Sequence, residues 1–295
     1  MSKIVTWACP ENFQSNSGQT NYLLYAVNVI RHKQFISPYS IKFCSQGSIP
    51  YVIDKQKISV SEGSLLVTNN GLEMECLPCD PGVKALVIFF TSELLQDVYH
   101  SYCSDENTLL EDWNPRVDPI NFFQHVHRYP NPLLGQLKVL EQRMALSDAS
   151  HHNLQPDVFY NLAESLLFLQ SDISKQINRV NTRTPATREE LFRRLLTAKE
   201  FMHDHWYSEL TLDKVARQAC LSPYHFHRSF QGVFGQSPMK WFRQLKLNNA
   251  KALLASGQMN VTQVALYCGF ADVFSFSKAF KRTLGVSPSV LTFNI

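Results

Sequence analysis

The sequence lacks the long apolar run that a signal peptide or a membrane span requires. Its opening residues, MSKIVTWACPENFQ, contain no such run, whereas about 20 consecutive apolar residues are needed to cross a bilayer. The seven cysteines are odd in number and scattered along the chain, which argues against a disulfide framework and favours reduced thiols. We therefore expect a cytoplasmic protein that makes no contact with a membrane.

The sequence also lacks the motifs of the common enzyme classes. It has no glycine-rich phosphate-binding loop, no nucleophile elbow and no convincing catalytic triad. Cys76 and Cys79 have metal or redox spacing, but no second pair or nearby histidine completes a zinc site. The His-x-His pairs at 125–127 and 203–205 have no third ligand. We expect no catalytic residue, no metal and no other cofactor.

What the sequence does contain is an internal duplication between residues 212 and 288. Val215 and Ala216 recur as Val264 and Ala265, 49 positions later. The offset then becomes 50, and the recurring positions are Phe226/Phe276, Phe230/Phe280, Gly235/Gly285 and Pro238/Pro288. A match of apolar, glycine and proline positions over this length indicates a repeated structural unit.

Each copy predicts a helix-turn-helix motif, one over 212–235 and one over 261–285. A short helix and a tight turn precede a capping residue, Ser222 or Asp272, which begins the second helix. Opposite its apolar face, that helix has a basic residue at the same position in both copies. In the major groove such a helix offers its N-terminal half to the bases, and Arg or Lys favours guanine.

Residues 238–255 predict a longer helix that links the two copies. Eighteen residues at about 1.5 Å each form a rod of about 27 Å. Two motifs carried by such a rod could lie about one DNA turn, roughly 34 Å, apart. The pattern therefore predicts that one chain reads two successive major grooves.

These residues resemble the AraC/XylS family of bacterial transcription regulators. The resemblance extends from near Thr187 to Pro288 and is carried by LDKVARQACLSPYHFHRSF, FGQSP, LKLNNAKALLASG and VALYCGFADVFSFSKAFKRTLGVSP. It implies that the residues nearest the bases are Tyr224, His227, Arg228, Phe274, Ser275 and Lys278. His225 and Gln231 lie on or beside the same face of the first helix, and Phe274 departs from the small or polar residue that the family often has.

Phosphate contacts would position the protein without reading sequence. We assign them to Lys240, Arg243, Lys246, Lys281 and Arg282. The charge distribution agrees, because residues 186–295 hold 14 Lys and Arg against 7 Asp and Glu, a net +7. Residues 1–185 hold 14 against 18, a net −4, which together gives the +3 of the chain. The basic part is the part with the duplication, as DNA binding requires.

Residues 20–92 predict a different kind of structure, a small β-sandwich or barrel. Short apolar runs alternate there with turn-like segments, and the resemblance, weaker here, implies a cupin-like fold. Five aromatic residues could line the mouth of a barrel and hold an apolar ligand, or could simply fill its core: Tyr22, Tyr25, Phe43, Tyr51 and Phe89.

Two long helices are predicted within 132–180, and they either cover the barrel or pair with a second subunit, as the resemblance implies. Residues 179–187 are polar and predict a linker. Thr187 and Glu190 then have the spacing of a capping box for the next helix.

The sequence thus predicts a multidomain α+β protein. Residues 1–180 would form a cupin-like domain for effector sensing or dimerisation, and 187–295 an all-α domain with two helix-turn-helix motifs joined by a linker helix. The implied partners are double-stranded promoter DNA, RNA polymerase, a small-molecule effector and a second subunit. The implied activity is transcription regulation, more often activation than repression, and not an enzyme reaction.

Three alternatives stay open at this point. The regulator could answer to a partner protein instead of a small molecule. It could be a redox or DNA-repair regulator that uses Cys76 and Cys79, which would require exposed thiols of low pKa. A purely structural adaptor would leave the matching positions of Arg228 and Lys278 without a reason.

Overall fold

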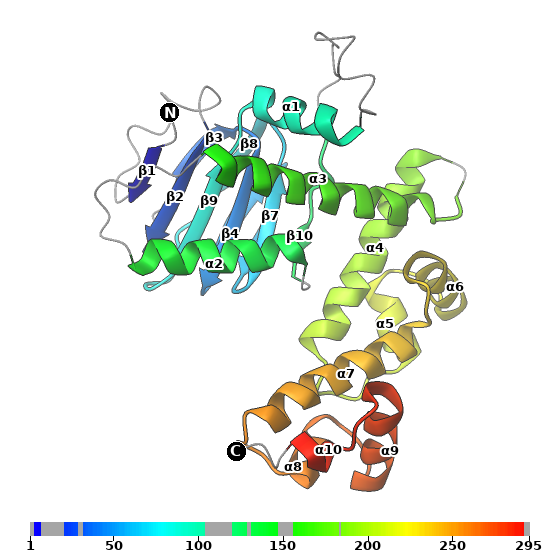
Figure 1. Ribbon diagram of the computed structural model, residues 1–295. Coiled ribbons are helices and arrows are strands. Elements are labelled where there is room, and N and C mark those ends of the chain that lie inside the picture. The colour runs from blue at the N-terminus through cyan, green and yellow to red at the C-terminus, as the bar shows by residue number, and fades with distance from the viewer. Residues whose placement is uncertain are drawn as a thin grey trace. The chain divides into compact units, whose positions relative to one another are not determined.

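A computed structural model describes residues 3–6, 21–28, 32–103, 120–128, 131–146, 156–182 and 184–291 (Figure 1). The chain divides into two compact units, Met1–Ile173 (the N-terminal unit) and Ser174–Ile295 (the C-terminal unit). The division falls inside the long helix α3, Pro156–Asn178, and therefore before the polar linker that the sequence predicts.

The N-terminal unit contains two β-sheets. The larger has the strand order β1-β2-β9-β4-β7-β10 and the smaller has β3-β8-β5-β6. Apart from the parallel pair β1–β2, the neighbouring strands are antiparallel. The bounds are β1 Lys3–Thr6, β2 Tyr22–Val27, β3 His32–Ser37, β4 Ser40–Gln46, β5 Ser48–Ile53, β6 Gln56–Ser61, β7 Ser64–Thr68, β8 Leu72–Cys76, β9 Lys84–Phe89 and β10 Val126–His127. The prediction of a β-rich N-terminal part is confirmed.

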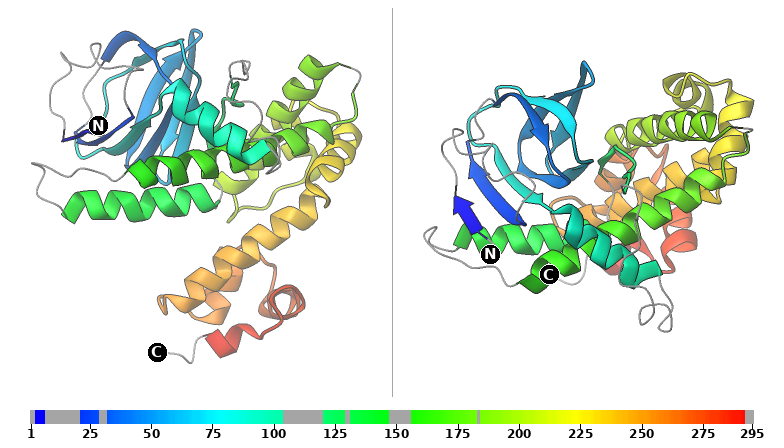
Figure 2. Two further views of the ribbon diagram at one scale, coloured as in Figure 1. Left: turned by 45° about the horizontal axis from the view of Figure 1, so that its top comes forward. Right: turned by 90° about the horizontal axis from the view of Figure 1, so that it is seen from above.

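The six-stranded sheet buries both of its faces. One face packs against three helices, α1 (Ser92–Cys103), α2 (Pro132–Leu146) and α3, which lie on one side of the sheet in both views of Figure 2. The other face packs against the four-stranded sheet in a second core. Tyr25 and Phe43 belong to the helix-covered core, so they do not line the space between the sheets.

The C-terminal unit is helical, as predicted. Its elements are α4 Pro185–Asp204, α5 Leu212–Gln218, α6 Pro223–Phe234, α7 Pro238–Ala255, α8 Val261–Tyr267, α9 Val273–Leu284 and α10 Pro288–Leu291. Helices α5 and α6 form one pair across a tight turn, and α8 and α9 form the second. Helix α7 connects the pairs.

The predicted caps of α6 and α9 are confirmed. In α6 the Ser222 side chain accepts a hydrogen bond from the backbone N–H of His225, and in α9 the Asp272 side chain accepts one from the backbone N–H of Ser275. Both helices end at a glycine with a positive φ, 72° at Gly235 and 78° at its repeat. Between these ends each helix buries two phenylalanines completely: Phe226, Phe230, Phe276 and Phe280.

The predicted cap of α4 is wrong. Thr184 is the N-cap, because its side chain accepts a hydrogen bond from the N–H of Thr187, and Pro185 occupies the first turn. Glu190 forms an ion pair with Arg194 instead, with 2.8 Å between Nε and the carboxylate oxygen. The Thr-Pro pair was the stronger start signal, since proline at the first helical position costs no hydrogen bond.

The turn of each helix pair contains a residue in the left-handed conformation at the same position. Cys220 has a φ of 51° in the first turn and Gly269 has a φ of 70° in the second. Cysteines at helix-turn junctions are ordinarily small core residues, but only Cys268 is buried here, whereas Cys220 is exposed. The residue that matches Cys268 in the first copy is Ala219, which is 1% exposed.

We expect reciprocal substitutions in these turns to change stability in opposite directions. Cys220→Gly should raise the free energy of unfolding by about 0.5 kcal/mol, because relief of left-handed strain slightly exceeds the added entropy of the unfolded chain. Gly269→Ala should lower it by more than about 1 kcal/mol, since the new Cβ would lie 3.0 Å from Lys246 Nζ and 3.2 Å from the Tyr207 carbonyl oxygen. Urea unfolding of the full chain measures both, and a change of the same sign in both variants would contradict this account.

Candidate nucleic-acid interface

Helix α6 exposes the face opposite its buried phenylalanines. Tyr224, near the start of the helix, is 75% exposed, so its ring does not belong to the core. His225, Arg228 and Gln231 are also exposed, and His227 is partly buried. The capped N-terminal half of α6 therefore presents an aromatic ring, imidazole groups and a guanidinium to the surroundings.

Helix α9 repeats this arrangement with more charge. Phe274 occupies the position of Tyr224 and is 84% exposed. Ser275, Lys278 and Lys281 are exposed on the same helix, as is Arg282. Single exposed apolar residues are common on protein surfaces, so the informative observation is that an exposed aromatic ring recurs at the same position in both helices.

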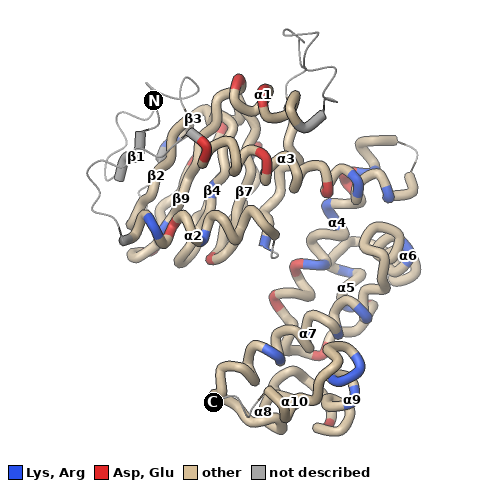
Figure 3. The backbone as a smooth tube through the Cα atoms, in the orientation of Figure 1, with Lys and Arg blue, Asp and Glu red and all other residues tan. Residues whose placement is uncertain are grey.

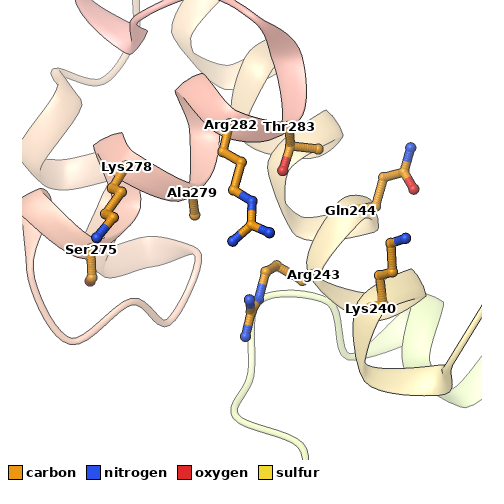
Figure 4. A pocket seen from close by; sticks show the side chains of 8 residues that line it. All are labelled: Lys240, Arg243, Gln244, Ser275, Lys278, Ala279, Arg282 and Thr283. Atoms are coloured by element: carbon orange, nitrogen blue, oxygen red, sulfur yellow. The ribbon is translucent and has the colours of Figure 1, made fainter.

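A cationic groove lies between α7 and α9. It has a volume of about 440 Å³, and its eight lining residues are Lys240, Arg243, Gln244, Ser275, Lys278, Ala279, Arg282 and Thr283 (Figure 4). Four of these side chains are cations and none is an acid. Like charges at such short range repel one another unless an anion lies between them. The groove is suited to bind a polyanion.

The charge of the groove continues along both helices. Helix α7 contains Lys240, Arg243, Lys246 and Lys251, helix α9 contains Lys278, Lys281 and Arg282, and neither contains Asp or Glu. Figure 3 shows these blue segments along the two helices. The net +7 found in this part of the sequence is thus concentrated on the helices that line the groove.

Lys246 is the exception, and its assignment as a phosphate contact is wrong. The side chain is 7% exposed, and Nζ lies 4.9 Å from the centre of the Phe242 ring. Burial lowers the pKa of Lys246, although Cys268 and Glu209 nearby act in the opposite direction. Its ammonium reaches the turn at Gly269 and is not available to DNA.

An aromatic brace joins the segment between α4 and α5 to the second helix pair. Trp206 and Tyr207 follow α4, before the first pair begins, while Tyr267 ends α8 of the second pair. The ring centroids of Trp206 and Tyr267 lie 5.7 Å apart, and those of Tyr207 and Tyr267 lie 6.4 Å apart. Trp206 also packs against the core of the second pair. The second pair is therefore connected to α7 and, independently, to the segment that precedes the first pair.

The four cations of the groove could be predicted from the sequence as DNA-binding residues, but the groove itself could not. The sequence predicts phosphate contacts for Lys240 and Arg243 and base contacts for Lys278. In the structure these three side chains line the same groove. Gln244 and Thr283 were missed altogether. The spacing 240, 243, 244 places all three residues on one face of a helix, which is the signal that could have indicated them.

The other candidate groups do not form a site among the described residues. Cys76 is buried, and burial raises the pKa of the partly buried Cys79, whereas a redox thiol needs exposure and a lowered pKa. Burial, with a contribution from His125, lowers the pKa of His127 to about 3. Within the described ranges no three metal-binding side chains cluster, and no helix is long and apolar enough to span a bilayer.

Comparison with known proteins agrees with this geometry. A family model described as a helix-turn-helix domain matches residues 215–292. The HTH-type transcriptional activator RhaR of Salmonella dublin is 27% identical over 190 residues, which cover 64% of this chain and 65% of RhaR. The chain thus matches slightly less than two thirds of the length of this relative.

Solved structures give matches to the C-terminal part. A transcriptional regulator with an AraC-type DNA-binding domain from Chromobacterium violaceum is 26% identical, with 34% of this chain and 89% of that chain covered and a TM-score of 0.33. The DNA-binding domain of AdpA, solved with a target DNA, is 26% identical, with 33% and 88% covered and a TM-score of 0.32.

Residues 215–292 thus match a helix-turn-helix domain, in the part of the chain that resembles the AraC/XylS family. The resemblance found in the sequence is confirmed over this part, and the relatives named above are transcription regulators, in agreement with the expectation that the protein is not an enzyme. The family model begins inside α5, at residue 215, and covers the rest of both helix pairs, α7 between them and α10.

We expect cations of the groove to contribute to DNA affinity without regard to sequence. Lys240→Gln should weaken binding to any duplex and reduce the slope of log affinity against log salt concentration by about one, because one fewer counter-ion is released. Fluorescence anisotropy with a random duplex between 50 and 200 mM salt measures the slope. Lys251→Gln, an exposed lysine of α7 outside the groove lining, is the matched control. An equal change in both variants would mean that the groove has no special role.

Proposed function

We propose that the protein is a transcription regulator that places α6 and α9 in two successive major grooves of promoter DNA. The observation that carries this proposal is the cationic groove between α7 and α9, which adjoins the exposed face of the second helix. The matching exposed face of α6 supports a second contact with the bases, made by α6 in the adjacent major groove. Helix α7, about 27 Å long, separates the two helices by a distance close to one DNA turn.

In this proposal the exposed residues divide into two roles. Arg228 and Lys278 contact base edges, together with the neighbouring polar residues of each helix, because they lie at matching positions in the N-terminal halves of α6 and α9. Tyr224 and Phe274 contact thymine methyl groups or sugars, since an exposed ring has apolar surface to bury. The remaining cations bind phosphates: Lys240, Arg243, Lys281 and Arg282.

The N-terminal unit acts as a cupin-like sensing and dimerisation domain in this proposal. Two facing antiparallel sheets with a core between them support the cupin-like fold. Val139, Tyr160 and Phe168 are exposed apolar residues on α2 and α3, at 51%, 43% and 55%, and they support pairing with a second subunit. The domain bounds in this proposal, 1–180 and 187–295, are those that the sequence predicts, whereas the compact units divide a few residues earlier, after Ile173.

The regulation proposed is activation in the cytoplasm by recruitment of RNA polymerase. RhaR, the relative described above, is named a transcriptional activator. The structure offers less support to the redox alternative, because neither thiol of the 76–79 pair combines exposure with a lowered pKa.

We expect Arg228→Ala to lose affinity mainly at one base pair. Removal of a guanidinium that contacts a guanine should cost about 1–3 kcal/mol on the specific site and relax specificity at that position. Binding to a set of duplexes with single substitutions measures the change. An equal loss on specific and random DNA would show that Arg228 contacts phosphate only.

We expect the two helix pairs to require a fixed spacing on DNA, and a footprint on the region upstream of the gene tests this. The wild-type protein should protect two adjacent major grooves, and a 5-base-pair insertion between them should weaken binding about 100-fold, because linked sites lose their effective concentration when geometry forbids joint contact. Trp206→Ala should reduce this preference about tenfold without changing affinity for one half-site.

Leu266→Ala, which alters an exposed residue beside Tyr267, is the control for the brace. Protection of one groove only, or the same spacing preference in Trp206→Ala and the wild type, would contradict the two-groove arrangement or the role of the brace respectively.

A further inference from the structure

The exposed surfaces of α6 and α9 can be compared position by position. From Pro223 to Gly232 and from Val273 to Arg282, the two helices show the same order of exposed, partly buried and buried residues. They also share the arrangement of their caps and of their buried phenylalanines. A difference between matching exposed side chains is therefore a difference in what each helix can bind, and not in how it is held.

The matching positions differ in charge. On α9, four residues that line the cationic groove lie three or four positions apart, on one face of the helix: Ser275, Lys278, Ala279 and Arg282. Their counterparts on α6 are His225, Arg228, Ser229 and Gly232. The exposed Lys281 is matched by the exposed Gln231. Helix α9 thus has three Lys or Arg where α6 has one.

The helix that precedes each pair increases this difference. Helix α4 contains four Lys or Arg and four Asp or Glu, including the ion pair of Glu190 with Arg194. Helix α7 contains four Lys or Arg and no acid. Two of these, Lys240 and Arg243, are exposed and line the groove with α9. Within the described ranges no ion pair includes a cation of the groove, so these charges are available to an external anion.

Arg243 and Arg282 lie on opposite walls of the groove. Arg243 comes from α7 and Arg282 from α9, and Figure 4 shows the Arg282 side chain extending from its helix toward Arg243. Guanidinium groups bind phosphate through charge-assisted hydrogen bonds, so the two arginines can hold one backbone phosphate between them. Such a contact carries no information about base sequence.

The C-terminal half of α6 does not offer an equivalent surface. Thr283 of α9 is exposed, whereas its counterpart Val233 is fully buried. The guanidinium of Arg179 donates to the Val233 carbonyl oxygen at 3.5 Å. The N-terminal half is the part of a recognition helix that meets base edges. On α6 it exposes the aromatic and ionisable side chains Tyr224, His225 and Arg228.

We propose that the two helix pairs have unequal roles on DNA. The second pair, together with α7, binds the phosphates of any duplex and supplies most of the affinity, with Arg243 and Arg282 on one phosphate. The first pair supplies most of the discrimination between base sequences, through the N-terminal half of α6. The proposal rests on the function proposed above, and it assigns affinity and specificity to different halves of the operator.

The ratio of the affinities for operator and random duplex separates the two roles. A phosphate contact strengthens binding to both duplexes and leaves their ratio unchanged, whereas a base contact strengthens binding to the operator alone. Fluorescence anisotropy with the full-length protein measures both affinities between 50 and 200 mM salt, on the footprinted operator and on a random duplex of equal length.

Charge-removing variants should separate in this assay. Arg243→Gln combined with Arg282→Gln should reduce the slope of log affinity against log salt concentration by about one on both duplexes, because the two arginines share one phosphate. The ratio should change by less than about twofold, since phosphates carry no sequence. Arg228→Gln should reduce the ratio at least about tenfold, because it removes a contact to a base.

Two further variants keep the test independent of folding. Arg243→Lys combined with Arg282→Lys retains both charges and should retain the slope. Lys251→Gln, an exposed lysine outside the groove lining, should change neither the slope nor the ratio.

The unequal roles would be overturned by an anchor-site double variant, Arg243→Gln with Arg282→Gln, that lowers the affinity ratio as much as Arg228→Gln does. An unchanged ratio in Arg228→Gln would overturn them as well, as would a Lys251→Gln slope that falls as far as that of the double variant. Failure of the underlying function is observed separately, because the wild-type protein would then give no two-groove footprint.

Discussion

The burial of α7 in two cores at once is the constraint on which the C-terminal unit depends. Near its N-terminal end, the ring of Trp241 lies 6.2 Å from that of Phe230 in α6. Near its other end, Leu247, Ala250 and Leu254 are fully buried with residues of α8 and α9. A helix fixed at both ends determines the distance between the two helix pairs, and the contact of Trp206 with Tyr267 restrains rotation about it. Binding energy is then not spent on ordering the pairs.

The C-terminal helices could be predicted from the sequence because their signals are local. A cap and an apolar repeat lie within a few residues of each other, as Ser222 and Phe226 do, and helix geometry converts them into a start and a buried face. Lys246 could not be predicted in this way. Periodicity gives the face of α7 on which it lies, but the turn at Gly269 that covers this face is a tertiary contact.

The N-terminal unit illustrates the same limit in a sheet. Alternation along β4 places Ile41 and Phe43 on one face and Lys42 on the other, yet both faces are buried, so the pattern does not tell which one the helices cover. Strand β8 is difficult to predict by itself, because its two glutamates lower its β propensity. The interior lysine was missed since a lysine in a strand is ordinarily assigned to the solvent.

The duplication has also diverged, and the divergence has a consequence for the genome that such a regulator serves. The second turn is one residue longer than the first, and α6 and α9 expose different side chains, Tyr224 and Arg228 against Phe274 and Lys278. If both helices bind DNA as proposed, the two halves of the operator differ in sequence, and one monomer recognises a direction along the duplex. Inverting the operator would then turn the N-terminal unit away from the promoter it faced, so the polarity of the site would carry information that a palindrome cannot.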